Sequence, residues 1–234
     1  MSRKIKNLSV SSSFNVTPPP PLPILPATIG LVASSRSGKT NVIRNLFLRD
    51  DMLQPYFEKD SIFIFCPTLN LSSDYDEFET QYKFDTFDVG KLQEIIAKQK
   101  GIVEDFGKQR TKPIAIILDD VAGDPKFDSS PIIRKLAMSG RHMLITTILS
   151  VQKLKCLERG CRLNLTHLIT FRCQNMSEYD QLLTEYVEKN ERPMYMEKFK
   201  QIFTEKPYQF IYWDFLNPDF SRRIWKNFDE VISF

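Results

Sequence analysis

The sequence of 234 residues lacks any apolar run of about 18 residues, so we expect no membrane-spanning helix. Its four cysteines, Cys66, Cys156, Cys161 and Cys173, are too few for a disulfide scaffold in a chain of this size, which favours a reducing compartment. The basic N-terminus has no long apolar stretch, so we expect no secretory signal. A hydrophobic fraction of 42% and a charged fraction of 26% exclude a wholly disordered chain.

Acidic side chains are missing from residues 1–49, which carry seven Lys or Arg residues. The remaining 185 residues hold 25 basic and 29 acidic side chains. The net charge of +3 therefore divides into +7 at the front of the chain and −4 behind it. This segregation indicates a localised anion-binding region. For Arg3, Lys4 and Lys6, a solvated basic tail is the simpler interpretation.

The N-terminal segment differs in composition from the rest of the chain. Residues 1–17 are Ser-rich and show no hydrophobic periodicity, which predicts a disordered arm. The proline-rich stretch from Pro18 to Pro26 predicts an extended polyproline II lead-in to the first strand. We therefore expect a basic arm and proline-rich lead-in over residues 1–23 and one folded domain over residues 24–234.

Beyond this segment, short apolar runs alternate with amphipathic helical patterns. Strands are predicted at residues 27–34, 61–66, 114–121, 144–151, 165–172 and 208–215. Helices are predicted at residues 38–53, 91–109 and 131–140 and from residue 177, with an interruption at Pro193 and a short helix closing the chain. Strands that are apolar on both faces indicate an α/β fold with a mostly parallel central sheet and helices on both faces.

The segment Ala33-Ser-Ser-Arg-Ser-Gly-Lys-Thr40 lies between the first predicted strand and the first predicted helix, where a P-loop must lie. Its backbone N–H groups would surround phosphate oxygens, Lys39 would reach the β- and γ-phosphates, and Thr40 would ligate Mg²⁺. Ala33 replaces the first glycine of the strict pattern. The predicted nucleotide-binding residues are Ser34, Ser35, Arg36, Ser37, Gly38, Lys39, Thr40 and Asn41. The alternative is a Ser-rich turn between a strand and a helix.

Residues 114–120, Ile-Ala-Ile-Ile-Leu-Asp-Asp, form an apolar strand that ends in two acids. Such a strand delivers carboxylates to the carboxyl edge of a parallel sheet, beside the P-loop. Asp119 would hold Mg²⁺, as in a Walker B strand, and Asp120 would polarise the attacking water. Taken alone, the motif also fits a strand that runs into a polar turn.

A complete predicted strand and helix over residues 61–109 separate the P-loop helix from the Walker B strand. This spacing resembles the additional-strand ATPases, in which a strand is inserted between the two motif strands. The fourth predicted strand ends in Ser-Val-Gln, which places Gln152 at the carboxyl edge of the sheet. Gln152 matches the polar sensor position of those ATPases, where the amide contacts the γ-phosphate or the water; alone, it also fits an exposed loop.

The order of these motifs, together with Leu-Asp-Asp-Val at 118–121 and Arg-His at 141–142, resembles the viral genome-packaging ATPases of the FtsK–HerA superfamily. The nearest type is that of poxviruses, other large DNA viruses of eukaryotes and virophages. The resemblance covers roughly residues 24–216 and implies a RecA-like ATPase that uses ATP and Mg²⁺. It further implies a homo-oligomeric ring, a hexamer or pentamer, that drives double-stranded DNA into a preformed capsid. We therefore expect residues 24–234 to be a P-loop ATPase domain.

The same resemblance implies partners and a location that no motif specifies. The expected partners are double-stranded DNA and a capsid vertex or a membrane-associated capsid protein, and the expected location is the viral factory in the host cytoplasm, with presence in the virion. In such rings an arginine of the neighbouring subunit completes the site. Arg141 is the first candidate, with Arg162 and Arg172 as further ones. Lys126 could contact DNA, although a solvated turn is the simpler interpretation of its acidic loop.

Three other functions fit parts of the pattern. They are a ring-forming DNA pump of another process, a small P-loop nucleotide kinase, and a nucleotide-gated capsid scaffold. A signalling GTPase is disfavoured because no Asn-Lys-Xaa-Asp motif occurs. The group Cys156, Cys161, His167 and Cys173 lacks the spacing of common zinc sites, which favours buried thiols over a metal.

Overall fold

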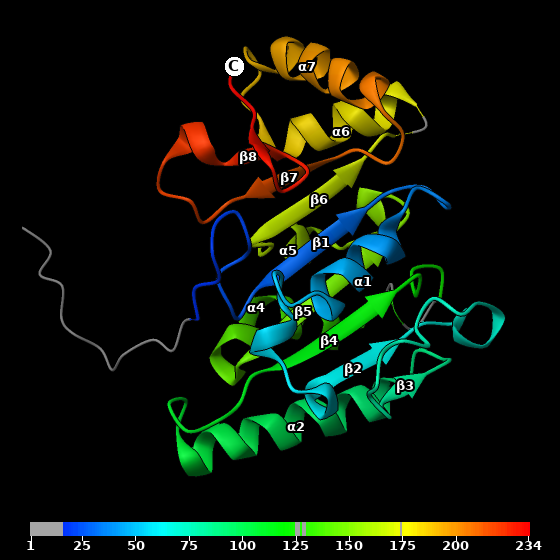
Figure 1. The fold of residues 1–234 in the computed structure, drawn as a ribbon, viewed down its shortest axis with the longest axis vertical. Helices are drawn as coiled ribbons and strands as arrows, with labels where there is room; N and C mark the ends of the chain where they lie inside the picture. Colours follow the sequence, from blue (N-terminus) through cyan, green and yellow to red (C-terminus); the bar gives the residue numbers. More distant parts are fainter. Residues whose placement is uncertain (1–15, 125–126, 128–129, 174) are drawn as a thin grey trace, which may run out of the picture.

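The computed structural model describes residues 16–124, 127, 130–173 and 175–234, and it confirms the predicted α/β fold (Figure 1). Its sheet has nine strands in the order β3-β2-β4-β5-β1-β6-β7-β8-β9. The strands are β1 (Thr28–Val32), β2 (Ile62–Phe65), β3 (Lys83–Phe84), β4 (Ile114–Asp119), β5 (Ile145–Val151), β6 (His167–Phe171), β7 (Phe210–Asp214), β8 (Ile224–Lys226) and β9 (Glu230–Val231). The α-helices are α1 (Lys39–Leu48), α2 (Val89–Phe106), α4 (Pro131–Ser139), α5 (Arg159–Arg162), α6 (Met176–Tyr186) and α7 (Arg192–Glu205).

Helices cover both faces of the sheet, as the sequence predicts. One hydrophobic core lies between the sheet and α2, α4, α6 and α7, and the other lies between the sheet and α1. Successive residues of β4 contribute to opposite cores: Ile116 packs into the first and Ile117 into the second. This alternation follows from the two-residue period of a strand, and it explains why β4 is apolar on both faces up to Asp119.

The sheet is parallel from β3 to β6 and antiparallel from β6 to β9. The short closing helix predicted from the sequence is wrong, because the chain instead ends in the strands β8 and β9. Trp225 of β8 is buried and lies opposite Tyr212 of β7. The edge of β7 offers backbone hydrogen-bonding groups and an apolar surface. A strand satisfies both, whereas a helix uses its backbone groups within itself and cannot pair with the edge.

The helical region from residue 177 forms two helices, and Pro193 lies in the first turn of the second, α7. Proline is well tolerated there because the first backbone N–H groups of a helix have no partner within the helix. Within the described residues, no helix is both long and apolar enough to cross a bilayer.

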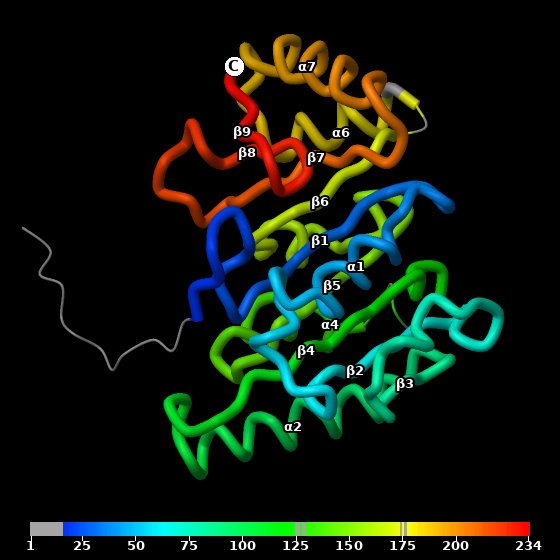
Figure 2. Tube along the Cα trace, in the orientation of Figure 1, coloured from blue at the N-terminus to red at the C-terminus, as the bar shows by residue number. Residues whose placement is uncertain are grey.

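The proline-rich segment is not the extended lead-in that the sequence predicts. Val16 and Leu25 exchange two backbone hydrogen bonds, of 3.0 and 2.8 Å, and close a turn between them. Leu22 and Leu25 are buried in the core that contains α1, and this apolar burial favours the folded turn over a solvated extended chain. The tube in Figure 2 shows this turn against the body of the protein. The disorder predicted for residues 1–17 is wrong at Val16, which belongs to this turn, and residues 1–15 lie outside the described residues.

Candidate active site

The carboxyl ends of three neighbouring parallel strands create the site. In the sheet, β5 lies between β1 and β4. Val32 of β1 is level with Val151 of β5, and Ser150 of β5 is level with Asp119 of β4. The P-loop, Gln152 and the acidic pair therefore leave the same edge of the sheet side by side. The inserted strand expected between the two motif strands is β5.

The loop between β1 and α1 turns sharply at two residues. Arg36 has φ of 61° and Gly38, the residue before α1, has φ of 101°. A side chain at Gly38 would be strained by this φ and would lie within 3.5 Å of the Tyr208 ring. The Ser37 hydroxyl donates to Ser34 O across the turn at 2.7 Å. The resulting loop presents the N-terminus of α1 at the sheet edge, an arrangement suited to phosphate oxygens.

Lys39 is buried beneath this loop, with only 4% of its surface exposed. Its Nζ donates to Ala33 O at 2.8 Å and lies 3.3 Å from Asp120 Oδ1. Ala33, the departure from the strict glycine pattern, thus supplies a backbone carbonyl that holds the lysine. The lysine is positioned between the P-loop and the Walker B acids, which is where a triphosphate would need a positive charge.

Asp119 is almost fully buried at the end of β4. Its Oδ2 accepts hydrogen bonds from Thr40 Oγ1 at 3.0 Å and from the Tyr75 hydroxyl at 2.7 Å. Burial raises the pKa of Asp119, and the hydroxyl groups of Ser150, Tyr75 and Thr40 oppose that shift. Its second oxygen, Oδ1, is buried without a hydrogen-bond partner among the described residues. A hydroxyl and a carboxylate with an unused oxygen form a donor set that fits Mg²⁺.

Asp120 adopts φ of 52°, a conformation that is uncommon for a residue with a side chain. Because of this turn, Asp120 does not follow the alternation of β4. Instead it faces Lys39 at 3.3 Å while its side chain stays partly exposed. Backbone conformations of this kind concentrate at functional sites, where surrounding contacts hold them in place.

The remaining predicted nucleotide-binding residues lie on the loop or the first turn of α1. Ser35, Arg36 and Asn41 are exposed. Gln152 is also exposed, and it lines a small cleft together with Ser34. The structure therefore brings the predicted P-loop residues, the acidic pair and Gln152 to one edge of the sheet.

The candidate arginines lie in different places. Arg141 is exposed and precedes β5, so it lies at the opposite edge of the sheet from the P-loop. Arg162 is mostly buried, pairs with Glu185 at 3.4 Å and donates to Leu157 O. Arg172 is exposed and directly follows β6, at the same edge as the P-loop. Lys126 lies outside the described residues.

The cysteine and histidine group does not form a metal centre in the structure. His167 is buried in β6, 3.3 Å from Asp214 and stacked on Tyr212. Cys66, Cys156, Cys161 and Cys173 are free thiols. Among the described residues, no three His, Cys, Asp or Glu side chains converge as a metal site.

Sequence reasoning missed Tyr75 and Tyr208. Tyr75 is buried in the polar segment between β2 and β3, where no periodicity distinguishes it. Tyr208 is 70% exposed beside Gly38, just before β7. The P-loop can be recognised in the sequence. Nothing in its pattern, however, indicates that Tyr208, far along the chain, lies against it.

The β1–loop–α1 unit, with acids at the end of a nearby parallel strand, places the chain in the class of P-loop NTPase folds. Within that class, the chain belongs to the family described as poxvirus A32 protein, whose sequence model matches residues 23–204. This confirms the family predicted from the motifs. No curated protein sequence matches the chain.

Solved structures share the fold at low sequence identity. The DNA-packaging ATPase B204 from Sulfolobus turreted icosahedral virus is 21% identical, with a TM-score of 0.62 over 87% of this chain and 97% of that chain. The genome-packaging NTPase B204 from Sulfolobus turreted icosahedral virus 2, in complex with AMPPCP, is 20% identical, with a TM-score of 0.59 over 86% and 96%. The type VII secretion ATPase EccC from Thermomonospora curvata is 13% identical, with a TM-score of 0.57 over 88% of this chain but 25% of that one.

Proposed function

We propose that the protein is an ATP-hydrolysing motor that translocates double-stranded viral DNA into a preformed capsid. The observation that carries this proposal is the convergence of Lys39, Thr40, Asp119 and Asp120 at one sheet edge, in a chain of the poxvirus A32 protein family. The B204 structures, which are genome-packaging NTPases solved among others with AMPPCP and ATP-gammaS, support it through their common fold.

The roles of the residues follow from their positions. The loop from Ser34 to Asn41 binds the phosphates, with Lys39 between them and the acidic pair. Thr40 and Asp119 would hold Mg²⁺, which when bound offsets negative charge on the phosphates. Asp120 accepts a proton from the attacking water as that water bonds to the γ-phosphorus and ADP leaves. Gln152, beside Ser34, orients that water.

In this proposal the active unit is a hexameric or pentameric ring. One subunit binds ATP at its sheet edge, and Arg141 of the neighbouring subunit stabilises the charge on the transferring phosphate. Arg141 acts only in trans, because within one chain it lies at the opposite edge of the sheet. Arg172 is the alternative, since it is exposed at the site's own edge. Arg162 is the weakest candidate because Glu185 already pairs with it.

The motor grips the phosphate backbone of DNA, so it needs no base-reading motif. It works in the viral factory of the host cytoplasm, docked at a capsid vertex or on a membrane-associated capsid protein, and it enters the virion. The basic arm at Arg3, Lys4 and Lys6 contributes positive charge toward DNA or the capsid.

The test is ATP turnover with and without double-stranded DNA, read beside the mass of the oligomer in solution. The proposal expects phosphate release that rises with DNA and a ring-sized assembly. Transfer of phosphate to a nucleotide acceptor by a monomer, with no response to DNA, would contradict it and indicate a kinase.

A further inference from the structure

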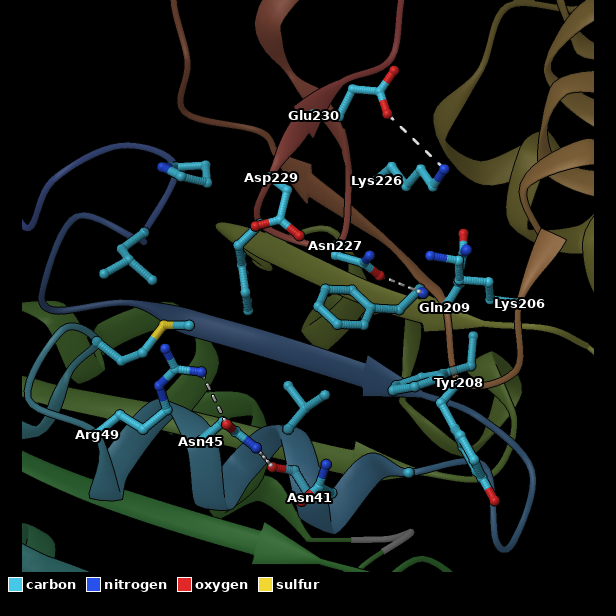
Figure 3. Close-up of a pocket in the computed structure, with 18 of the residues that line it drawn as sticks. Asn41, Asn45, Arg49, Lys206, Tyr208, Gln209, Lys226, Asn227, Asp229 and Glu230 are labelled. Carbon is cyan, nitrogen blue, oxygen red and sulfur yellow. Dashed lines mark hydrogen bonds and ion pairs between the residues drawn. The ribbon is translucent and has the colours of Figure 1, made fainter.

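A cavity of about 990 Å³ opens directly beside the P-loop. One wall is α1, which contributes Asn41 and Asn45, and the opposite wall is the turn between β8 and β9, which contributes Asn227. Gly38 and Tyr208 lie at the P-loop end of the cavity. Figure 3 shows Tyr208 beside the start of α1, with Asn227 across the cavity from the helix.

The position of the cavity relative to the acids indicates which part of a bound nucleotide would lie in it. The acids Asp119 and Asp120 lie at the end of β4, on one side of β1, whereas the cavity lies toward β6, β7 and β8 on the other side. A triphosphate whose terminal phosphate points to the acids has its other end toward the cavity. That end carries the sugar and base of a nucleotide.

Tyr208 has two unusual features for an aromatic residue. Its side chain is 70% exposed, although large aromatic side chains are normally buried. Its backbone has φ of 62°, which is costly for a bulky residue. A side chain at Gly38 would lie 3.5 Å from this ring and 3.6 Å from Phe171. The ring therefore stands directly over the start of the phosphate-binding helix.

The polar groups along α1 complete a site for a sugar and a base. Asn41 and Asn45 are one helical turn apart, and the Asn45 side chain donates to Asn41 O at 2.8 Å. The Asn45 amide also accepts from Arg49 Nη1 at 3.4 Å, so it is already engaged at both ends. The exposed side chain of Asn41 therefore presents the amide next to the P-loop, where ribose hydroxyls need donors and acceptors. The exposed ring of Tyr208 supplies the flat apolar surface on which a base stacks.

We propose that this cavity binds the nucleoside part of the nucleoside triphosphate, with the base stacked on Tyr208 and the ribose along Asn41. The inference rests on the proposed function, since it names the base-binding part of the same site. Every base has a flat face that can stack on an aromatic ring. The cavity is therefore expected to increase affinity for the nucleoside with little specificity for the base.

The experiment compares binding of ATP with binding of inorganic triphosphate, which has no sugar or base. The variant is Tyr208→Asn, because asparagine tolerates a positive φ and removes the ring. ATP affinity is expected to fall about tenfold, the order of one base–aromatic stack, while triphosphate affinity stays at the wild-type value. Tyr208→Phe should keep the ATP affinity. Phe220→Ala removes an exposed aromatic that is not part of the cavity lining and should change neither.

The outcomes separate the two proposals. If Tyr208→Asn binds ATP as tightly as the wild type, or loses ATP and triphosphate equally, the base does not stack on Tyr208 and the inference is overturned. In both cases the wild type still binds ATP, so the proposed function stands. If the wild-type protein binds neither ATP nor triphosphate, the proposed function fails and the inference fails with it. A melting temperature for each variant shows that it is folded.

Discussion

The Tyr75 hydroxyl donates a 2.7 Å hydrogen bond to Asp119 Oδ2, the same oxygen that accepts from Thr40. Tyr75 is buried, and burial raises the pKa of its hydroxyl well above the usual value, so it remains a donor. The segment between β2 and β3 is thereby tied to the acid that would hold Mg²⁺. Partners of this kind fix the orientation of a metal-binding carboxylate.

Tyr75→Phe should therefore raise the Mg²⁺ concentration needed for half-maximal nucleotide binding, by about tenfold. Phenylalanine keeps the ring and its packing against Phe78 and removes only the donor. A Mg²⁺ titration of fluorescent-nucleotide binding measures the effect. The matched control is Tyr82→Phe, a ring of the same segment that stacks on Phe63. An unchanged Mg²⁺ requirement in Tyr75→Phe would show that Asp119 does not depend on this hydroxyl.

Asp120→Asn should separate binding from hydrolysis. The amide keeps the size of the side chain but cannot take a proton from water, so turnover should fall by about 10²–10⁴. Nucleotide affinity should change little, because Lys39 also interacts with Ala33 O and remains in place. Phosphate release and equilibrium nucleotide binding are measured on the same sample, with the exposed Asp105→Asn on α2 as the control. If Asp120→Asn hydrolyses ATP at the wild-type rate, Asp120 has no part in the mechanism.

Packaging of DNA that persists in Asp120→Asn would favour a nucleotide-gated scaffold over a motor.

The trans role of Arg141 predicts a gain on mixing two inactive proteins. Arg141→Ala subunits keep their own phosphate site, and Lys39→Ala subunits keep Arg141, so a mixed ring contains complete sites at some boundaries. ATP turnover of the mixture should exceed that of either variant alone. Arg172→Ala mixed with Lys39→Ala is the parallel experiment. If only the Arg172 mixture recovers activity, Arg172 is the residue that acts in trans.

The sequence indicates the residues of the candidate site best where they lie close together along the chain. Lys39 lies within the short P-loop motif that begins at Ala33. Asp119 and Asp120 end a continuous apolar run. Each can therefore be inferred from its own stretch of sequence, with no knowledge of what it contacts in the fold. The Tyr75–Asp119 contact joins residues 44 positions apart, and Tyr75 lies in a polar segment with no period. No local pattern specifies such a pairing.

The same limit explains the errors at the two ends of the chain. Strands β8 and β9 form because β7 leaves an edge that can be paired, which depends on the assembled sheet. The proline-rich segment folds back because Leu22 and Leu25 reach the core that contains α1. In both cases the conformation depends on contacts with residues far away in the sequence, which local composition does not reveal.

The buried His167 predicts how stability depends on pH. Burial lowers the pKa of His167, against the opposing effect of Asp214, so the folded protein holds it neutral. The unfolded chain binds a proton near its ordinary pKa of about 6.5, so stability is complete above that pH and falls as the pH decreases below it. The slope should reach at most about 1.4 kcal/mol per pH unit.

Melting temperatures between pH 8 and pH 5 measure this effect. His167→Gln should flatten the decrease below pH 6.5, whereas His142→Gln, at an exposed position before β5, should leave most of it in place. Equal slopes for the wild type and His167→Gln would mean that another group causes the acid sensitivity.

The central claim is that the protein hydrolyses ATP at the P-loop, and Lys39→Ala tests it most directly. Lys39 Nζ contacts Ala33 O and Asp120 and makes no part of the apolar core, so the variant should fold with a melting profile close to that of the wild type. The measurement is phosphate release from ATP in the presence of double-stranded DNA, for both proteins at equal concentration. The account predicts turnover by the wild type and none by the folded Lys39→Ala variant. Equal turnover by the two proteins would contradict it.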